Sequence, residues 1–155
     1  MSEALSPNNP TNEIALEEKS QRNWAMCSHL GFFLAFLGMT YGGFCVALLI
    51  YTFKKDTLFV QKHAKAALNY QITQIIIWSL TGIFMLLTHY KQLMNIDASD
   101  MGYEPNFFGF SHLMAGAFVL EVLFLFFAID SLRNGLRASN GLDPDYKFYF
   151  YRFVK

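Results

Sequence analysis

The stretch that decides the fold runs from Ala66 to Leu87 and reads AALNYQITQIIIWSLTGIFMLL. It carries no charged residue, and about 20 consecutive apolar residues suffice to cross the hydrocarbon core of a bilayer. Two further tracts share this character: residues 25–53 carry no charge, and residues 107–129 carry one, Glu121. Three such tracts are typical of membrane helices and exclude a water-soluble domain. The sequence therefore predicts an all-α, polytopic integral membrane protein.

The composition of the whole chain agrees with this prediction. Of 155 residues, 54% are hydrophobic and 15% are charged, whereas about a quarter of the residues of an ordinary soluble domain are charged. Twelve basic and twelve acidic residues leave a net charge of zero, which argues against nucleic acid as a partner. Cys27 and Cys45 both lie inside the first tract, so we expect them to serve as small apolar residues.

The chain divides into three regions by its composition. Residues 1–20 are polar and are predicted to be a mobile tail, with a helix beginning near Glu17. Residues 21–137 hold the three apolar tracts and form the predicted membrane domain. Residues 138–155 are dense in aromatic and basic side chains, which favours a position at the membrane interface.

The first tract is too long for one straight membrane helix. As a helix, residues 25–53 would extend roughly 43 Å, against about 30 Å of hydrocarbon. Gly38, Gly42 and Gly43 lie near its middle. Two interpretations stay open: a single tilted span, which gives three spans in all, or two shorter helices that meet near Gly42-Gly43, which gives four helices. The G-x-x-x-G spacing of Gly38 and Gly42 is also typical of close helix packing, but we prefer the hinge.

Basic residues predict how the protein sits in its membrane. Four lysines lie between the first two tracts, five basic residues follow the last tract, and the loop at 88–106 holds only Lys91. Because basic loops stay in the cytoplasm, the 54–65 loop and the C-terminus are predicted to be cytoplasmic, in a bacterial inner membrane. The side of the N-terminus stays open. The lysines are also candidates for contact with anionic lipid headgroups; they are Lys54, Lys55, Lys62 and Lys65.

Glu121 is the sharpest single candidate for function. It lies within the last tract, where ionising a carboxyl group in lipid costs several kcal/mol. We expect it to face other helices or a wet cavity, or to remain protonated. Its role is then either a hydrogen bond across the bundle, with the amides of Asn69, Gln71 or Gln74 as candidate partners, or an ion or proton step.

A second group of candidates lies on one face of the second tract. His63, Asn69 and Thr73 recur at helical spacing, and Gln71 lies nearby. Because lipid offers no hydrogen bonds, this face is predicted to be a seam between helices or a site for a headgroup or peptide. His29, one turn inside the first tract, is a further candidate hydrogen bonder. His29 and His63 lack supporting ligands at metal-binding spacing, so neither a metal nor a cofactor is predicted.

Four strings carry a resemblance to a known family. They are NWAMCSHLG (23–31), KKD (54–56), FVQKHAKAALNYQ (59–71) and ASNG (138–141). In them the chain resembles the bacterial membrane family of unknown function related to the Tic-twenty component of the chloroplast inner-envelope import machinery. The resemblance covers roughly Trp24 to Lys155 and implies four membrane helices with both ends on one side. Relatives commonly place a proline where this chain has Cys45-Val46-Ala47.

The sequence contains no catalytic constellation, neither a Ser-His-Asp set, a phosphate-binding glycine loop nor a carboxylate pair, and no enzyme is predicted. The predicted function is that of a small non-enzymatic scaffold or assembly component. Its polar face from His63 to Thr73 would engage a membrane protein partner or a second copy, among membrane lipid. The alternative is a transporter or channel subunit in which Glu121 and the His63–Asn69–Thr73 face line a path.

Overall fold

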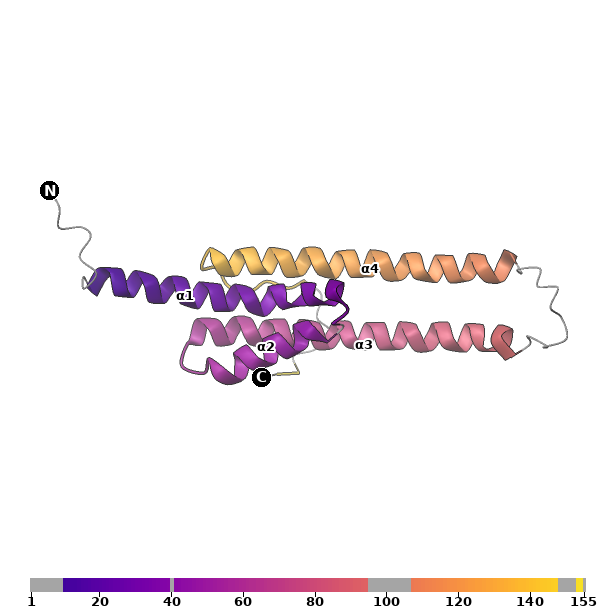
Figure 1. The fold of residues 1–155 in the computed structure, drawn as a ribbon, viewed down its shortest axis with the longest axis horizontal. Helices are drawn as coiled ribbons and strands as arrows, with labels where there is room; N and C mark the ends of the chain where they lie inside the picture. Colours follow the sequence, from indigo (N-terminus) through magenta and orange to yellow (C-terminus); the bar gives the residue numbers. More distant parts are fainter. Residues whose placement is uncertain (1–9, 40, 95–106, 148–152, 155) are drawn as a thin grey trace. The chain divides into compact units, whose positions relative to one another are not determined.

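A computed structural model gives the fold and describes residues 10–39, 41–94, 107–147 and 153–154 (Figure 1). Every regular element in these ranges is helical, which confirms the predicted all-α class. The elements are α1 (Pro10–Leu30), the 3-10 helix η1 (Gly31–Leu37), α2 (Gly42–Phe53), α3 (Leu58–Met94) and α4 (Phe107–Ser139). The first apolar tract is therefore broken, and the four-helix interpretation holds.

The helices are longer than the sequence predicts. α1 begins at Pro10 rather than near Glu17, so residues 10–20 are helical rather than a mobile tail. Proline suits the first turn of a helix, where its missing N–H is not needed, and an ion pair between Glu18 and Arg22 links successive turns. α3 continues to Met94, past the predicted start of a loop at residue 88. The rest of that predicted loop, 95–106, lies outside the described residues.

Gly38 produces the break in the first tract. Its φ of 80° is left-handed, a conformation that glycine adopts at little cost. Its N–H bonds the Ala35 carbonyl, and the Met39 N–H bonds the Leu34 carbonyl, which satisfies the last carbonyls of η1. The chain then turns into α2, whose first residues are Gly42 and Gly43.

The described residues fall into two compact units. The first comprises the described parts of Met1–Ile72 and Ala128–Lys155, and in it α2 runs back along the beginning of α3 (Figure 1). Contacts fix an antiparallel register, because Ala47 packs on Ala67 and Leu68, while Ile50 packs on Val60 and Ala64.

Close glycine contacts draw η1 and α2 together. A Cβ on Gly43 would lie 2.9 Å from the Phe32 backbone, and one on Gly42 would lie 2.7 Å from Leu34 Cβ. Both positions therefore need glycine for close approach. The sequence treated packing and hinge as competing interpretations, but Gly38 supplies the hinge and Gly42 the packing.

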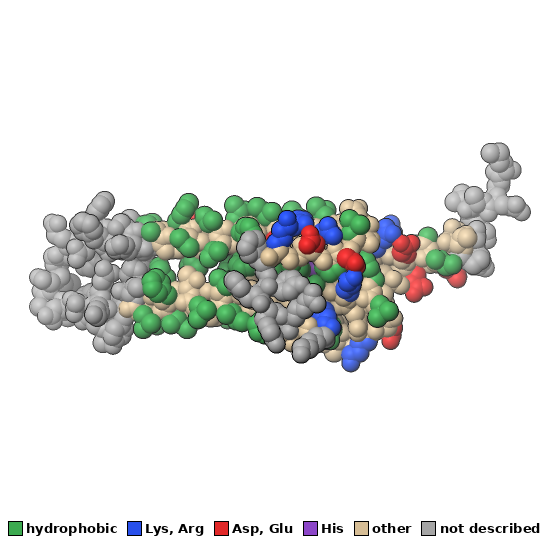
Figure 2. All heavy atoms as spheres, turned by 180° about the vertical axis from the view of Figure 1, so that it is seen from behind, with side chains coloured by type: hydrophobic (Ala, Val, Ile, Leu, Met, Phe, Trp, Pro, Cys, Tyr) green, Lys and Arg blue, Asp and Glu red, His purple; other side chains and the backbone are tan. Residues whose placement is uncertain are grey.

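The second unit comprises Thr73–Phe127. Here α3 and α4 meet through the rings of Trp78 and Phe124, whose centroids are 5.6 Å apart. Most large apolar side chains of this unit are exposed, and Figure 2 shows how densely such side chains cover one face of the molecule. They include Ile76, Leu80, Ile83, Phe84, Leu86, Leu87, Met114, Phe118, Val119, Val122, Leu125 and Phe126.

Two of the described helices are long and apolar enough to cross a membrane. They are Leu58–Leu87, with 30 residues, and Met114–Ser139, with 26 residues. Only 22% of the apolar window of each is buried within the chain. A core helix of a soluble protein would be mostly covered, so lipid is the environment that these side chains fit.

Candidate functional site

The candidate site of the first unit is a chain of three buried side chains, His29, His63 and Tyr146, which we call the histidine–tyrosine chain. His29 comes from the last turn of α1, His63 from the second turn of α3, and Tyr146 from the segment after α4. The Tyr146 hydroxyl lies 2.5 Å from His29 Nδ1, and His29 Nε2 lies 2.9 Å from His63 Nδ1. Both histidines are 0% exposed.

The proton positions along the histidine–tyrosine chain can be assigned from the Tyr146 hydroxyl at one end. Burial raises the pKa of Tyr146 well above its ordinary value, so the hydroxyl stays protonated, and it donates to His29 Nδ1 in the tautomer that carries the His29 proton on Nε2. His29 Nε2 then carries a proton and donates to His63 Nδ1. The remaining nitrogen, His63 Nε2, is buried and has no hydrogen-bond partner among the described residues.

Aromatic rings enclose the histidine–tyrosine chain. Tyr70 stacks on Tyr146 with centroids 4.0 Å apart, and Phe59 lies against His63 at 4.6 Å. Water is kept from the hydrogen bonds on these sides, and a hydrogen bond that is shielded from water is electrostatically stronger than an exposed one.

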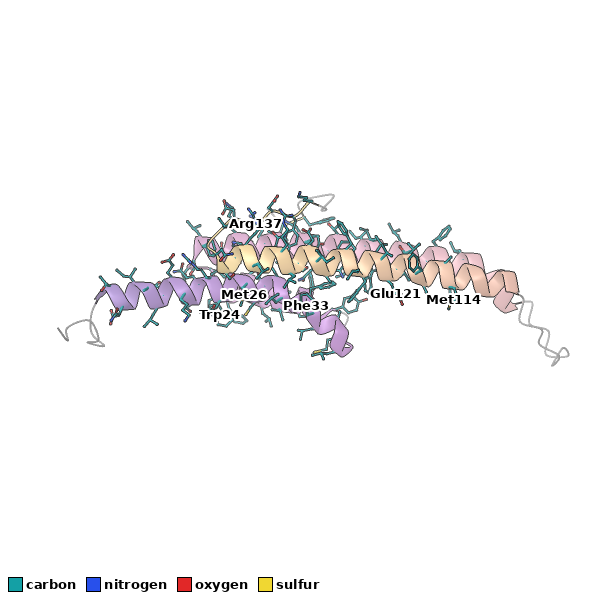
Figure 3. The ribbon with its side chains drawn as sticks, turned by 90° about the horizontal axis from the view of Figure 1, so that it is seen from above. Trp24, Met26, Phe33, Met114, Glu121 and Arg137 are labelled. Atoms are coloured by element: carbon teal, nitrogen blue, oxygen red, sulfur yellow. The ribbon has the colours of Figure 1, made fainter. Side chains whose placement is uncertain are left out.

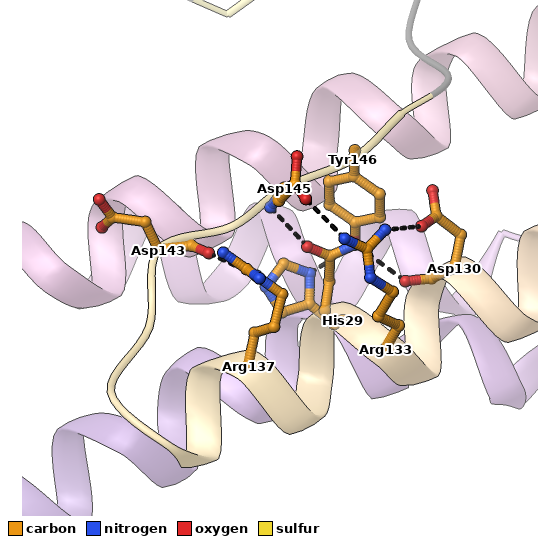
Figure 4. Close-up of polar contacts among 8 residues, drawn as sticks. His29, Asp130, Arg133, Arg137, Asp143, Asp145 and Tyr146 are labelled. Carbon is orange, nitrogen blue, oxygen red and sulfur yellow. Dashed lines mark hydrogen bonds and ion pairs between the residues drawn. The ribbon is translucent and has the colours of Figure 1, made fainter.

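A second set of contacts holds the segment Asp143–Tyr146 against α4 (Figure 4). Arg133 pairs with Asp145 at 2.5 Å and lies 3.6 Å from Asp130. The Asn134 side chain accepts the Asp145 N–H at 2.7 Å. Arg137 Nε donates to the Asp143 carbonyl at 2.8 Å. These contacts position Tyr146 at the end of the histidine–tyrosine chain.

Asn69 ties a second part of the C-terminal region to α3. Its amide nitrogen donates to the Val154 carbonyl at 3.1 Å, and its amide oxygen accepts the Val154 N–H at 2.7 Å. The side chain thus satisfies both backbone groups of Val154, as a neighbouring strand would. The amide of Asn69 is engaged in this way rather than with Glu121.

The structure places the other predicted polar residues in different settings. Gln71 is buried and lies beside Gly43: a Cβ on Gly43 would be 3.1 Å from Nε2 of Gln71. Thr73 is also buried, in the second unit. Glu121 is exposed on α4 and projects from that helix (Figure 3). The expectation that Glu121 faces other helices or a wet cavity, or remains protonated, stays a prediction.

Two of the four lysines predicted to contact lipid have partners within the chain. Lys62 forms an ion pair with Asp143 at 2.7 Å, and the Lys54 ammonium lies 4.8 Å from the centre of the Trp24 ring. Lys55 is exposed and Lys65 is half-buried.

Replacing Lys62 with glutamine should cause a small, salt-sensitive loss of thermal stability in detergent. The hydrogen bond from Lys62 lowers the pKa of Asp143, so the pair stabilises the fold above the ordinary carboxyl pKa of about 3.9 and stops doing so as the pH falls through the lower folded value. About 1 M salt should abolish the difference from wild type. Lys55→Gln is the matched control, and an equal loss in that variant would contradict the pairing.

Sequence reasoning missed most of this site. Tyr146 was expected at the interface with the other aromatic residues of 138–155, but it is buried; residues 148–152 of that region lie outside the described residues. Arg133 is one of the five basic residues after the last tract, and the sequence did not single out Asn134. No local spacing marks these residues, because their partners are far away in sequence: 117 residues separate His29 from Tyr146.

Taken together, the apolar helices and the internally paired polar side chains define a small helical membrane protein. The chain matches the family model described as the magnetosome magnetite crystal formation protein family, MamF/MmsF, over residues 20–154, and it belongs to that family. The resemblance to the Tic-twenty-related family is therefore corrected, since this is the family that matches. No curated protein and no solved structure matches the chain.

Proposed function

We propose that the protein is a non-enzymatic scaffold of the magnetosome membrane that supports the formation of magnetite crystals. The family supports the setting. The observation that carries the scaffold role is the histidine–tyrosine chain, in which buried polar groups bond one another and hold α1, α3 and the C-terminal segment together. Such a network makes a rigid framework on which a partner can assemble.

The contact face of this scaffold is the exposed side of α4 around Glu121. Its exposed neighbours Phe118, Val122 and Leu125 are apolar, and a carboxyl group among them needs a hydrogen-bond partner that lipid cannot supply. We infer that another membrane protein or a second copy of this chain supplies it. The sequence predicts that a partner binds the His63–Thr73 face. We propose the Glu121 face of α4 instead, because the polar side chains of the His63–Thr73 face are buried within their own chain.

We further propose that the Lys54–Lys65 loop and the C-terminus face the cytoplasm. The charge distribution supports this orientation, since basic residues follow α2 and α4 while the 88–106 loop is poor in them. The scaffold is then accessible to cytoplasmic proteins at its basic end and to lipid along its apolar helices.

The first test is genetic. A strain that lacks the protein should make magnetite crystals of altered number or size, as measured by electron microscopy, and expression of the full chain should restore them. Glu121→Leu should restore them poorly. Crystals that are unchanged in number and size in the deletion strain would refute the proposed role.

The second test asks whether Glu121 marks the contact face. A photoreactive residue at Leu125 should crosslink to protein in native membranes, whereas one at exposed Leu80 of α3 serves as the matched control and should give mainly lipid adducts. Glu121→Gln keeps a neutral hydrogen bonder and should preserve the crosslink. Glu121→Leu should weaken association roughly five- to thirtyfold. Intact crosslinks together with loss of ion flux in Glu121→Gln would favour the transporter alternative instead.

A further inference from the structure

The first apolar tract is too short on each side of its turn to cross a bilayer. α2 holds 12 residues, or about 18 Å of helix, and the segment from Ala25 to the end of η1 at Leu37 is of similar length. The hydrocarbon core is about 30 Å thick. Each arm of this hairpin, which we call the η1–α2 hairpin, therefore reaches only part of the way across.

Contacts with α3 show how far along that helix the η1–α2 hairpin reaches. At its shallow end Ile50 packs on Val60 and Ala64, near the start of α3. At its deep end Gly43 lies against Gln71, since a Cβ on that glycine would be 3.1 Å from Gln71 Nε2. Gln71 is about 8 Å along α3 from Ala66, where the uncharged tract begins, and about 24 Å of apolar helix continues to Leu87. The turn thus lies in the half of the uncharged tract that is nearer to the Lys54–Lys65 loop.

Side chains at the turn are apolar and uncovered. Leu37 is 76% exposed, Met39 is 58% exposed and Tyr41 is 61% exposed. At this depth the Leu37 and Met39 side chains meet lipid acyl chains, which is the environment that stabilises them. The same side chains would be costly in water, so a turn that emerges on the far side of the membrane is disfavoured.

We propose that the η1–α2 hairpin enters only the leaflet next to the Lys54–Lys65 loop, and that the protein therefore concentrates in strongly curved membrane with that leaflet on the convex side. The hairpin adds helical cross-section to this leaflet alone. The extra cross-section on one side fits a convex leaflet, whose lipids are spread apart. This inference goes beyond the scaffold role, because it requires only that α3 and α4 span the membrane.

The depth of the turn is tested first, in sealed vesicles that hold the full chain. Cys27→Ala and Cys45→Ala remove the two free cysteines, and Tyr41→Cys then places a thiol at the turn. A membrane-impermeant maleimide should label it from neither side, while nitroxide lipids should report a depth within the hydrocarbon core. Asn140→Cys, exposed beyond the end of α4, is the positive control. Labelling of Tyr41→Cys from the side opposite Asn140→Cys would overturn the proposal.

Curvature preference is tested next with the full chain, labelled with a fluorophore at Asn140→Cys and reconstituted into giant vesicles from which narrow tubes are pulled. With the C-terminus outside, fluorescence per lipid should be roughly twofold or more higher in the tube than in the vesicle. With the C-terminus inside, the protein should be depleted from the tube. The reversed orientation is the matched control because the protein is unchanged. Equal fluorescence per lipid in both orientations would contradict the curvature preference.

Discussion

Replacing His29 with leucine should lower the free energy of unfolding by about 1–3 kcal/mol. The substitution replaces the imidazole with an apolar side chain of similar size and leaves the Tyr146 hydroxyl and His63 Nδ1 buried without their partner. Thermal denaturation of the purified protein in detergent measures the loss. Trypsin should also cleave faster after Lys147, which follows Tyr146, because that segment is no longer held against α1.

The matched control for this variant is Asn23→Leu, an exposed position on the same helix. It should change neither the denaturation curve nor the rate of cleavage after Lys147. A double-mutant cycle with His63→Leu should show coupling of about 0.5–3 kcal/mol, because the two rings contact one another. Equal effects of His29→Leu and Asn23→Leu, with no coupling to His63, would show that the histidine–tyrosine chain does not stabilise the fold.

Replacing Gly43 with alanine should destabilise the protein by about 1–3 kcal/mol, the typical cost of overpacking a close contact. Its Cβ would lie 2.9 Å from the Phe32 backbone, and backbone atoms cannot move aside as a flexible side chain can. The η1–α2 hairpin should open, and the contact between Gly43 and Gln71 should be lost with it. Thermal denaturation in detergent measures the destabilisation.

Gly82→Ala provides the control for Gly43→Ala. A Cβ at Gly82 would meet nothing within 4 Å, and alanine is favoured over glycine inside a helix by up to about 1 kcal/mol. Gly82→Ala should therefore leave the protein as stable as wild type or slightly more stable. Parallel losses in the two variants would indicate a general effect of glycine replacement rather than tight packing of the hairpin.

Several features of the fold follow from local sequence. An uncharged tract of membrane-spanning length has few solutions other than a helix, because the backbone must satisfy its own hydrogen bonds in lipid. The central helices were predicted for that reason. Helix ends were predicted less well, since α3 and α4 extend past the apolar tracts into polar sequence, where hydropathy no longer marks a boundary.

Local sequence patterns do not predict the contacts of the candidate site. His29 and His63 were both singled out from the sequence, yet nothing in their spacing indicated that they bond each other. Tyr146 belongs to an aromatic stretch that is typical of a membrane interface, and its burial follows from its stacking on Tyr70 and its contact with His29. For Glu121 the sequence predicts a position that faces other helices or a wet cavity, or a protonated side chain; in the structure its side chain is exposed on α4.

Hydropathy and charge act over short stretches of chain, so the sequence alone predicts a polytopic helical membrane protein with polar residues inside its apolar tracts. The folded chain adds that the first tract turns back at Gly38, that His29 pairs with His63 and Tyr146, and that the Glu121 side chain is exposed. At Gly38 the sequence left a straight and a broken tract open, and the close packing of Gly42 and Gly43 against η1 favours the turn. No local pattern indicates the histidine–tyrosine chain, because its contacts join residues as far as 117 positions apart in sequence.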